Sequence, residues 1–551
     1  MTIQKIDGTT FGQMILVSAE HLSNHREMID SLNVFPVPDG DTGTNMNLTL
    51  TSGANEVEQV DHKHVGQIGE VLAKGLLMGA RGNSGVILSQ LFRGFSKAIR
   101  DKETLTTKNF AEALQAGVET AYKAVMKPVE GTILTVAKDA ANAAVEKAEE
   151  VDDHIEFMEH VLTEAKASLQ RTPELLPVLK EVGVVDSGGQ GLVTVYEGFL
   201  SVLKGEALPT YANKVNVEQM INAEHHKMHQ DFMNTEDIEF GYCTEFMIKL
   251  ERDKEHPFKE EDFRNRLGNQ GDSLLVVADD DLVKVHIHAE YPGEVLTYAQ
   301  NYGSLVNVKI ENMREQHTSI VGDAKKEEKV VMAEYAIVTV ALGSGIKEMF
   351  ESLGANVVIE GGQTMNPSTQ DIANAIQKAN AKRILVLPNN KNIVMAAEQA
   401  ADLVEGEVAV VPTKSIPQGM SAMLAFHPDR SLEDNHKEMV AASEEVKTGQ
   451  VTYAVRDTQI DGLEIAKGNF MGIADGKITS TSKNKLEAIT QLLQGMIEED
   501  EDEIVTILTG EDATDEEVSE IEQYMEEHFE DMEIEVHNGN QPIYSYIFAI
   551  E

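Results

Sequence analysis

Apolar residues in the first part of the chain recur at the spacing of amphipathic helices. The recurrence, every three or four positions, runs over residues 11–32, 65–77, 85–99, 107–126 and 133–148. Ala and Leu are abundant there, and the strict alternation of half-buried strands is hard to find. This pattern predicts an all-α domain over residues 1–205.

The middle of the chain, residues 206–325, has a different pattern. Short runs rich in apolar and β-branched residues predict strands at 241–248, 272–277 and 282–288. Helical spacing predicts a helix at 258–267. We therefore expect a small α+β domain between the two larger parts of the chain.

Strand-like and helical runs alternate after the charged segment at 323–329. The expected strands are 335–342, 356–359, 383–387 and 407–411, with helices between them. Such alternation predicts βαβ units and a largely parallel sheet, with ligand loops at the carboxyl ends of its strands. The last part of the chain, from residue 504, predicts a smaller αβ subdomain, so that residues 326–551 form an α/β domain.

Composition narrows the classes of partner. The 551 residues include 46 basic and 93 acidic side chains, a formal net charge of −47. Nucleic acids and anionic membrane surfaces require clustered Lys and Arg, so this charge argues against both. The single Cys excludes an internal disulfide framework and fits a reducing cytoplasm. No signal-peptide pattern and no apolar run of roughly 18 residues is present, so we expect a cytoplasmic protein without a transmembrane segment.

The stretch at residues 33–47, NVFPVPDGDTGTNMN, has the densest chemistry in the chain. Asp39 and Asp41 are two positions apart in a loop rich in Pro and Gly, so their carboxylates can converge on one hard cation. Magnesium is usually held by one or two carboxylates together with substrate phosphates. Thr44 and Asn45 offer donors at a possible helix start, where backbone N–H groups favour phosphate. A solvated Asp-Gly turn is the alternative.

A second loop, residues 79–85 with the sequence GARGNSG, directly precedes an apolar helix. Gly-rich turns that open a helix can cradle phosphate. The loop lacks the Lys of a P-loop, so that motif is excluded. A Gly-rich helix cap without any ligand would look similar, although Asn83 and Ser84 favour a binding role.

Two further interhelical loops are candidates. Residues 127–132, KPVEGT, connect two predicted helices, and residues 185–191, VDSGGQG, place Asp186 among glycines before another helix. Either loop can line a nucleotide pocket. The alternatives are a simple connection ended by Pro for the first loop and a flexible turn capped by Asp186 for the second.

The predicted middle domain contains a possible zinc site. His286 and His288 are two positions apart on a predicted strand, so both rings face the same side of the sheet. Cys243, the only Cys of the chain, lies on another predicted strand of the same domain. Thiolate and imidazole ligands suit Zn²⁺. Two surface imidazoles and a buried thiol are the alternative.

The string DGDTGTNMN resembles the nucleotide-binding loop of the dihydroxyacetone-kinase nucleotide-binding-subunit family. From near its amino end to its last strand-like segment, the chain is similar to the catalytic ATP-binding subunits of bacterial fatty acid kinases. This resemblance implies an antiparallel barrel of helices with ATP bound between the loops at one end. It also implies catalytic, metal-binding roles for Asp39 and Asp41, and a nucleotide site made of Thr42, Gly43, Thr44, Asn45, Gly82, Asn83, Ser84, Gly85, Thr132, Ile133, Asp186, Ser187 and Gly188.

The third metal ligand is a departure from the wider family. That family has a third carboxylate upstream of its metal pair, where the nearest match in this chain is Asn33, and Asp30 matches less well by spacing. An amide oxygen can bind Mg²⁺ but adds no negative charge. Whether one or two magnesium ions bind stays open.

The resemblance extends to function and partners. It implies an ATP-dependent kinase that phosphorylates the carboxylate of a fatty acid and yields an acyl phosphate for phospholipid synthesis. The fatty acid would be presented by a separate DegV-like fatty-acid-binding protein that docks on the C-terminal domain, which is itself DegV-like. The loops at 361–369, 388–392 and 412–419 are candidates for that docking surface or for a second active site. The middle domain is expected to support a homodimer.

Two other functional classes remain open. A self-sufficient small-molecule kinase of the dihydroxyacetone type would need a substrate-anchoring His near the nucleotide loop. His21 and His25 are the nearest in sequence, but on a helix we expect them at the surface. A non-enzymatic scaffold that responds to nucleotide is the other class, and the Asp39–Asp41 pair counts against it.

Overall fold

The computed structural model describes residues 2–34, 40–60, 63–125, 127–206, 242–250, 258–268, 270–278, 282–312, 332–362, 365–460, 462–498 and 501–551. The chain forms two compact units, one made of residues 1–211 and 332–551 and the other of residues 212–331. Within the first unit we call residues 2–206 the helical lobe and residues 332–551 the C-terminal lobe. The second unit is the middle domain.

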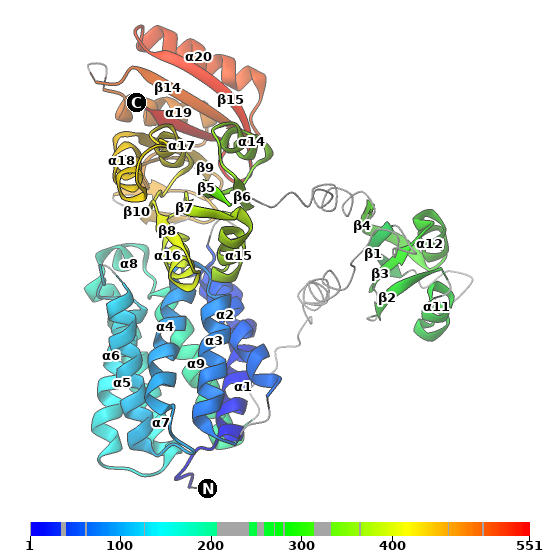
Figure 1. Cartoon of the computed structure of the whole chain (residues 1–551), viewed down its shortest axis with the longest axis vertical. Coiled ribbons are helices and arrows are strands. Elements are labelled where there is room, and N and C mark those ends of the chain that lie inside the picture. Colours follow the sequence, from blue (N-terminus) through cyan, green and yellow to red (C-terminus); the bar gives the residue numbers. More distant parts are fainter. Residues whose placement is uncertain are drawn as a thin grey trace. The chain divides into compact units, whose positions relative to one another are not determined.

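The helical lobe is a bundle of helices that run side by side (Figure 1), and their packing closes the bundle into a ring. Each helix from α1 to α7 packs on the next one, and α9 packs on both α7 and α1, which closes the ring. The prediction of an all-α helical barrel is confirmed. The helices are α1 (Gly8–Asp30), α2 (Thr42–Glu58), α3 (Val65–Gly79), α4 (Gly82–Ile99), α5 (Thr107–Ala124), α6 (Ile133–Ala148), α7 (His154–Leu175), α8 (Pro177–Val182) and α9 (Ser187–Lys204).

Aromatic side chains fill the centre of this barrel. The ring of Phe95 lies 5.6 Å from that of Phe11 and 5.1 Å from that of Phe110, which in turn lies 6.3 Å from Phe199. All four side chains are buried. Burial of one such side chain stabilises a fold by about 1.5–3 kcal/mol. The apolar stripes predicted from the sequence therefore face inward and meet in one core.

The C-terminal lobe begins with a parallel sheet in the order β6-β5-β7-β8. Helices connect its strands, so the predicted βαβ units are confirmed. The elements of this part are β5 (Ala333–Ala341), α14 (Ser344–Ser352), β6 (Val357–Glu360), α15 (Thr369–Ala379), β7 (Ala381–Leu387), α16 (Val394–Leu403), β8 (Glu407–Val410), α17 (Ile416–Leu424) and α18 (Leu432–Glu445).

A second, six-stranded sheet in the order β13-β12-β9-β16-β14-β15 completes the lobe. The expected subdomain from residue 504 supplies three of these strands, and the other three come from residues 447–482, where the apolar pattern predicts no strand. The elements are β9 (Lys447–Tyr453), β10 (Thr458–Ile460), β11 (Leu463–Ile465), β12 (Phe470–Ala474), β13 (Lys477–Ser482), α19 (Lys485–Met496), β14 (Ile504–Gly510), α20 (Asp515–His528), β15 (Glu533–Gln541) and β16 (Tyr546–Ile550).

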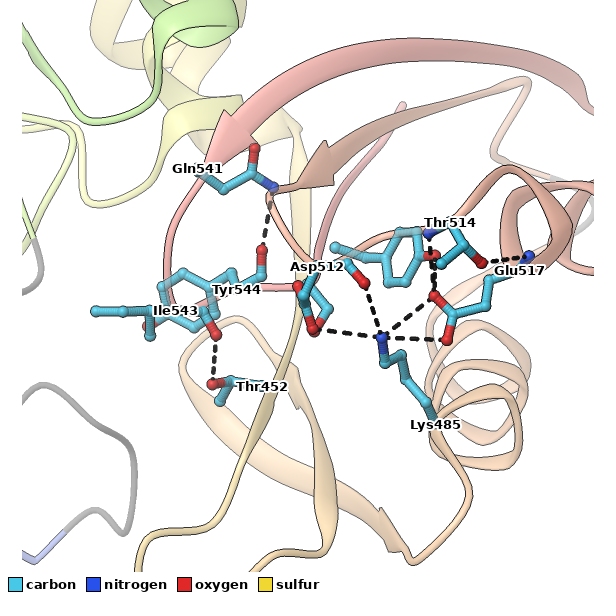
Figure 2. Close-up of polar contacts among 10 residues, drawn as sticks. Thr452, Lys485, Asp512, Thr514, Glu517, Gln541, Ile543 and Tyr544 are labelled. Carbon is cyan, nitrogen blue, oxygen red and sulfur yellow. Dashed lines mark hydrogen bonds and ion pairs between the residues drawn. The ribbon is translucent and has the colours of Figure 1, made fainter.

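A tight connection joins β15 to β16 (Figure 2). The Gln541 side chain donates to the carbonyl oxygens of Leu508 at 3.0 Å and Tyr544 at 3.2 Å, and Thr452 Oγ1 donates to the carbonyl of Ile543 at 2.7 Å. Ile543 has φ of +72°, which is strained for a β-branched residue. These hydrogen bonds hold the strained turn and fix the position of Tyr544.

Lys485 anchors α19 to the neighbouring loop (Figure 2). Its Nζ lies 3.3 Å from Asp512 Oδ2 and 3.1 Å from Glu517 Oε1, and its side chain is mostly buried. The Tyr546 hydroxyl donates to Glu517 Oε2 at 3.0 Å. Burial, together with the negative charge of Glu517, raises the pKa of Tyr546, so this hydroxyl keeps its proton.

The middle domain is an antiparallel sheet in the order β2-β3-β1-β4 with two helices and its own apolar core. The predicted α+β fold is confirmed. Its elements are β1 (Tyr242–Leu250), α11 (Glu260–Leu267), β2 (Gly271–Ala278), β3 (Leu282–Ala289), α12 (Pro292–Ala299) and β4 (Gly303–Asn312). The register pairs Cys243 of β1 with His288 of β3, and Glu245 with His286. The side chains of Cys243, His286 and His288 lie outside the described part of the structure.

The two lobes of the first unit share buried surface. Ala80 and Val86 of the helical lobe are buried in the same apolar cluster as strands β5 and β7 and helices α15 and α16. The backbone N–H of Thr369 donates to the carbonyl of Ala80 at 3.0 Å, and Gln399 Nε2 donates to the carbonyl of Leu77 at 3.0 Å. The loop after α3 is therefore part of both lobes.

Candidate functional site

The amino ends of α2 and α4 lie side by side because glycines permit the contact. A Cβ on Gly82 would lie 2.4 Å from Asn45 Nδ2, and a Cβ on Gly85 would lie 2.3 Å from Thr49 Oγ1. Gly82 also has φ of +57°, which glycine adopts without strain. The residues that precede these helices, Asp41 and Arg81, make no side-chain cap bond. Helix amino ends of this kind attract anions through backbone N–H groups and the helix dipole.

The amino ends of α6 and α9 also meet. Asp186 caps α9 by accepting from the N–H of Gly189 at 2.6 Å, and it accepts from the N–H of Ile133 at the start of α6. A Cβ on Gly188 would lie 3.2 Å from Ile133 Cβ, so glycine allows close packing here. Burial of the Asp186 carboxylate raises its pKa to about 6, and the two hydrogen bonds act in the opposite direction, because they favour the ionised form.

Asn33 joins the two pairs of helices. Its Oδ1 accepts from Thr42 Oγ1 at the start of α2, at 2.7 Å, and from Ser187 Oγ at the start of α9, at 3.2 Å. Four helix amino ends are thus gathered at one end of the barrel, where their backbone N–H groups favour an anion. Thr132, which precedes α6, uses its hydroxyl to donate to the carbonyl of Val129 at 2.8 Å.

Asp30 and Asn33 have different positions. Asp30 accepts from the backbone N–H of Thr44 at 3.1 Å and from its hydroxyl at 2.8 Å, so it anchors the first turn of α2. Burial raises the pKa of Asp30, and these hydrogen bonds oppose that effect. Asn33, by contrast, lines a pocket that also contains Asp41. Of the two candidates for a third metal ligand, Asn33 is the one on the pocket side.

Asp41 is contacted from the other lobe. Asn366, which is 325 positions further along the chain, donates its Nδ2 to the Asp41 carboxylate and lies 3.5 Å from Asn45 Oδ1. Arg81 holds this loop, because its Nη1 donates to the Asn366 carbonyl at 2.7 Å and its Nη2 lies 3.4 Å from Asp371 Oδ2. The C-terminal lobe therefore reaches the predicted metal ligand directly.

A pocket of about 550 Å³ lies between the helical lobe and the C-terminal lobe, and we call it the interlobe pocket. From the helical lobe it is lined by Asn33, Val34, Asp41, Thr42, Asn45, Asn83 and Ser84. From the C-terminal lobe its lining includes Asn390, Lys391, Asn392, Lys414, Ser415, Gln418, Glu444, Lys447, Asp475 and Tyr544. The pocket is polar on both sides and large enough for part of a nucleotide and a small acceptor group.

The structure distributes the predicted site residues over three places. Asn33, Asp41, Thr42, Asn45, Asn83 and Ser84 line the interlobe pocket. Gly43, Thr44, Gly82 and Gly85 support it from behind, through helix packing and the bond to Asp30. The third group lies beside the pocket, where α6 meets α9, and consists of Thr132, Ile133, Asp186, Ser187 and Gly188. Asp39 lies outside the described residues, so the pairing of Asp39 with Asp41 stays a prediction.

The donor atoms around Asp41 fit magnesium better than zinc. Asp41 and Asn33 offer carboxylate and amide oxygens, the ligands that Mg²⁺ prefers. Among the residues that the structure describes, no group of three or more His, Cys, Asp or Glu is arranged to hold a metal. Nothing in the structure supports the zinc site expected at Cys243, His286 and His288, whose side chains are outside the described part.

The sequence pattern did not assign roles to the polar residues that the C-terminal lobe brings to the pocket. Asn366, Asn390, Lys391 and Lys414 lie in the three Gly- and Pro-rich loops at 361–369, 388–392 and 412–419. Each loop follows a strand of the parallel sheet, and ligands bind such sheets at their carboxyl ends. That rule correctly located the loops, but it could not show that another lobe of the same chain would face them.

Comparison with known proteins agrees with this architecture. Three family models match the chain: the DAK2 domain over residues 36–201, the middle domain of the FakA-like fatty acid kinase subunits over 239–320, and the C-terminal domain of the same subunits over 336–551. Protein YloV of Bacillus subtilis (strain 168) is 60% identical over the full length of both chains. The chain belongs to the FakA-like family of fatty acid kinase subunits. The resemblance found in the sequence is confirmed.

Two solved structures resemble parts of the chain. A DegV family protein from Corynebacterium glutamicum is 16% identical with a TM-score of 0.32, over 39% of this chain and 96% of that one. The dihydroxyacetone kinase of C. freundii, solved with AMP-PNP and Mg²⁺, is 18% identical with a TM-score of 0.28, over 34% of this chain and 33% of that one.

Within the described residues, none of the helices combines the length and apolar character needed to cross a bilayer.

Proposed function

We propose that this chain is the ATP-binding catalytic subunit of a two-component fatty acid kinase. It transfers the terminal phosphoryl group of ATP to the carboxylate of a fatty acid, which a separate DegV-like fatty-acid-binding protein presents through contact with the C-terminal domain. The product is an acyl phosphate for phospholipid synthesis. Family membership supports the kinase and the fatty acid, and the geometry of the interlobe pocket supports the details below.

The convergence of four helix amino ends beside Asp41 is the observation that carries this proposal. Phosphoryl transfer depends mainly on positioning and on stabilising negative charge. The first turns of α2 and α4, with Asn83 and Ser84, would bind phosphate oxygens through backbone and side-chain donors. Asp39 and Asp41 would hold Mg²⁺, which supplies positive charge at the phosphates when bound. The Asn33 amide oxygen would join them as a third ligand in exchange for a hydrogen bond that it accepts from Thr42 or Ser187.

The acceptor chemistry agrees with the lining of the pocket. A fatty acid carboxylate, with a reference pKa of roughly 4, is already ionised at pH 7 and needs no general base. Its oxygen attacks the terminal phosphorus, a new P–O bond forms, and the bond to the bridging oxygen of ADP breaks. The described residues that line the interlobe pocket include no His that could remove a proton from a hydroxyl.

Two small, partly apolar cavities among the described residues are consistent with a separate carrier for the acyl chain. The cavity between the sheets of the C-terminal lobe, lined by residues such as Leu342, Ile346 and Ile547, measures only about 40 Å³. The cavity inside the helical barrel, beside Phe92 and Phe199, measures about 20 Å³. Pockets that enclose organic ligands are roughly 300–1,000 Å³. The acyl chain would therefore stay in the partner while its carboxylate enters the interlobe pocket.

A self-sufficient kinase for small hydroxyl compounds is less well supported. The expectation that His21 is a surface residue is wrong, because it is buried and its Nε2 lies 3.2 Å from Glu197 Oε2. Its ring also contacts His25, at a centroid distance of 4.3 Å. Neither ring lines the interlobe pocket. His21 thus joins α1 to α9 through Glu197, which favours a structural role over the anchoring of a substrate.

Transfer of labelled phosphate tests the proposal. Purified full-length protein would be mixed with labelled ATP, Mg²⁺ and oleate, with and without a DegV-like fatty-acid-binding protein. We expect label in the fatty acid only when that protein is present. Asp41→Asn should reduce transfer by about 100-fold or more, because a charged ligand near the phosphates is lost. Asp101→Asn, at an exposed position of the same lobe, is the matched control.

Label that reaches oleate without the carrier, or that reaches dihydroxyacetone instead, would overturn the two-component proposal. A scaffold without enzymatic activity would show no transfer in any arm. The proposal also includes a homodimer formed through the middle domain and domain boundaries near residues 205 and 325, which size-exclusion chromatography with light scattering and limited proteolysis would check. It further includes a cytoplasmic location, which fractionation of cells would check.

A further inference from the structure

The positive charge at the interlobe pocket comes from the C-terminal lobe. The seven residues that the helical lobe contributes to the described lining include Asp41 and no Lys or Arg. The nearby Arg81 is engaged with Asn366 and Asp371. A nucleotide triphosphate brings several negative charges to this point, in a chain whose formal net charge is −47. Among the described lining residues, the basic side chains that could contact its terminal phosphate therefore lie on the opposite wall.

Three lysines lie on that wall, and they differ in their environment. Lys447 is engaged in ion pairs, with its Nζ 2.9 Å from Asp502 Oδ2 and 3.4 Å from Glu498 Oε1. Lys414 is exposed in the loop before α17, and its backbone N–H donates to Gln418 Oε1 at 2.8 Å. No ion pair of the Lys414 ammonium is found within the described part of the chain. Lys391 is exposed in the neighbouring loop after β7.

Two acidic side chains share this wall with the lysines. The Asp475 carboxylate accepts from the backbone N–H of Thr448 at 2.9 Å, so it is held by its own sheet. Glu444 is exposed near the end of α18. Lys447 is matched by its own acidic partners, so Lys391 and Lys414 are the lysines that oppose Glu444 and Asp475 on this wall. The described wall of the helical lobe has the negative charge of Asp41 and no basic side chain.

Asn390 adds an unused donor beside these lysines. Its side chain is 4% exposed, and its Oδ1 accepts from the backbone N–H of Asn392 at 2.8 Å. That bond fixes the orientation of the amide, because the exchanged orientation would point two N–H groups at each other. Asn390 Nδ2 is then a buried donor that has no partner among the described residues. Buried donors are nearly always satisfied, and Asn390 also lines the interlobe pocket, so this donor is available to an acceptor atom of a ligand there.

We propose that Asn390 and Lys414 form a binding site for the terminal phosphate of the nucleotide, so that the C-terminal lobe completes the kinase site across the interlobe pocket. This inference rests on the proposed function. It assigns to the lobe a role at the reacting group, in addition to docking of the partner. Lys391, in the adjacent loop, would contribute charge at longer range.

Nucleotide binding by the full-length protein tests this site without any need for turnover. Calorimetry with Mg²⁺ would compare AMP-PNP, which has the third phosphate, with ADP, which lacks it. For Lys414→Met we expect about a tenfold loss of AMP-PNP affinity, the effect of one charge-assisted hydrogen bond, and ADP affinity within twofold of wild type. Lys414→Arg should restore most of the AMP-PNP affinity. Lys437→Met, at an exposed position on α18 of the same lobe, is the control.

Asn390→Leu gives a second test, because it removes the donor while it keeps the size of the side chain. It should show the same selective loss for AMP-PNP, with an unchanged melting temperature for the ADP-bound protein. Equal AMP-PNP affinity in wild type and Lys414→Met would overturn the inference. So would an increase in the KM for the loaded carrier protein alone, which would assign the lysine to the acceptor carboxylate. Failure of the wild type to phosphorylate any acid would refute the proposed function but would leave this binding comparison valid.

Discussion

Asp186 allows a quantitative test of how the end of the barrel beside the interlobe pocket is built. Its carboxylate caps α9 and also accepts from the first N–H of α6, and burial raises its pKa to about 6 from a reference value of 3.8. At about 1.4 kcal/mol per pKa unit, this difference corresponds to about 3 kcal/mol. Because the residue keeps some exposed surface, we take this figure as an upper value.

The sign follows from linkage between protonation and folding. A raised pKa means that the folded state holds the proton of Asp186 more tightly than the unfolded state does. The contribution of this group to stability is therefore largest below about pH 4, falls as the pH rises to about 6, and is constant above that. At neutral pH, the ionised carboxylate destabilises this end of the barrel relative to a neutral side chain of the same shape.

Asp186→Asn should remove this dependence on pH. The amide oxygen still caps α9, since Asn is a good capping residue, and no charge is buried. We expect the difference in local stability between the variant and wild type to shift by up to about 3 kcal/mol, in favour of the variant, between pH 4 and pH 7. Any cost of the substitution that does not depend on pH cancels in this comparison.

Hydrogen exchange of peptides from α6 and α9, in protein without nucleotide, is the suitable assay. A chain with several domains does not unfold in one step, and it contains no Trp to report on a single lobe. Asp7→Asn is the matched control. Asp7 caps α1 with a pKa lowered by its hydrogen bond to the N–H of Thr10, so its contribution is lost only below the reference pKa of 3.8. A difference between Asp186→Asn and wild type that stays flat from pH 4 to pH 7 would refute the buried-charge explanation.

Two further predictions, the first with a matched control, concern contacts at the amino ends of α2 and α4. Gly43→Ala would place a Cβ 2.3 Å from the carbonyl oxygen of Arg26, so we expect a loss of about 1–3 kcal/mol, seen as a lower melting temperature and weaker nucleotide binding. Gly12→Ala, with an ordinary contact of 3.5 Å, should be tolerated and should favour α1 by up to about 1 kcal/mol. Arg81→Ala removes the bond to the Asn366 carbonyl, and a loss of about 1.5–3 kcal/mol should appear as faster hydrogen exchange in residues 365–371. Exchange at wild-type rates there would contradict the role of Arg81 in joining the lobes.

The regular parts of the fold were predictable from sequence because their apolar residues recur with a fixed period, or because the elements that pack together are near each other in the chain. Helix α6 has the predicted bounds of 133–148, and the parallel order of β5, β7 and β8 follows from their alternation with helices. Strands β9 to β13 were missed. The buried positions of β9 do not alternate, and β10 and β11 have three residues each, so neither gives a period-2 signal.

The half of the site that the C-terminal lobe contributes was not predictable, for a different reason. Motif spacing located the residues before and inside α2, α4 and α9, since glycine, carboxylate and amide side chains there follow local rules for turns and helix starts. The contact of Asn366 with Asp41 joins positions 325 residues apart and depends on how two lobes pack. No local pattern encodes such a contact. His21 shows the same limit, because the helix pattern could not reveal that Glu197 of α9 faces it.

The choice of Asn at position 366 has a physical rationale that a charged residue would not offer. An amide N–H can satisfy the Asp41 carboxylate while the lobes are together, yet it leaves the negative charge of that group intact. A Lys or Arg at this position would form an ion pair with Asp41 and would compete with a cation for it. By this argument Asn366 orients the Asp41 carboxylate and leaves its negative charge available to the proposed divalent ion. The other polar atom of the Asn366 side chain, Oδ1, is buried without a partner among the described residues. In the proposed site the C-terminal lobe thus has two separate roles. Asn366 contacts the carboxylate that we propose as a metal ligand, and Lys414 places positive charge on the pocket wall where the terminal phosphate would lie.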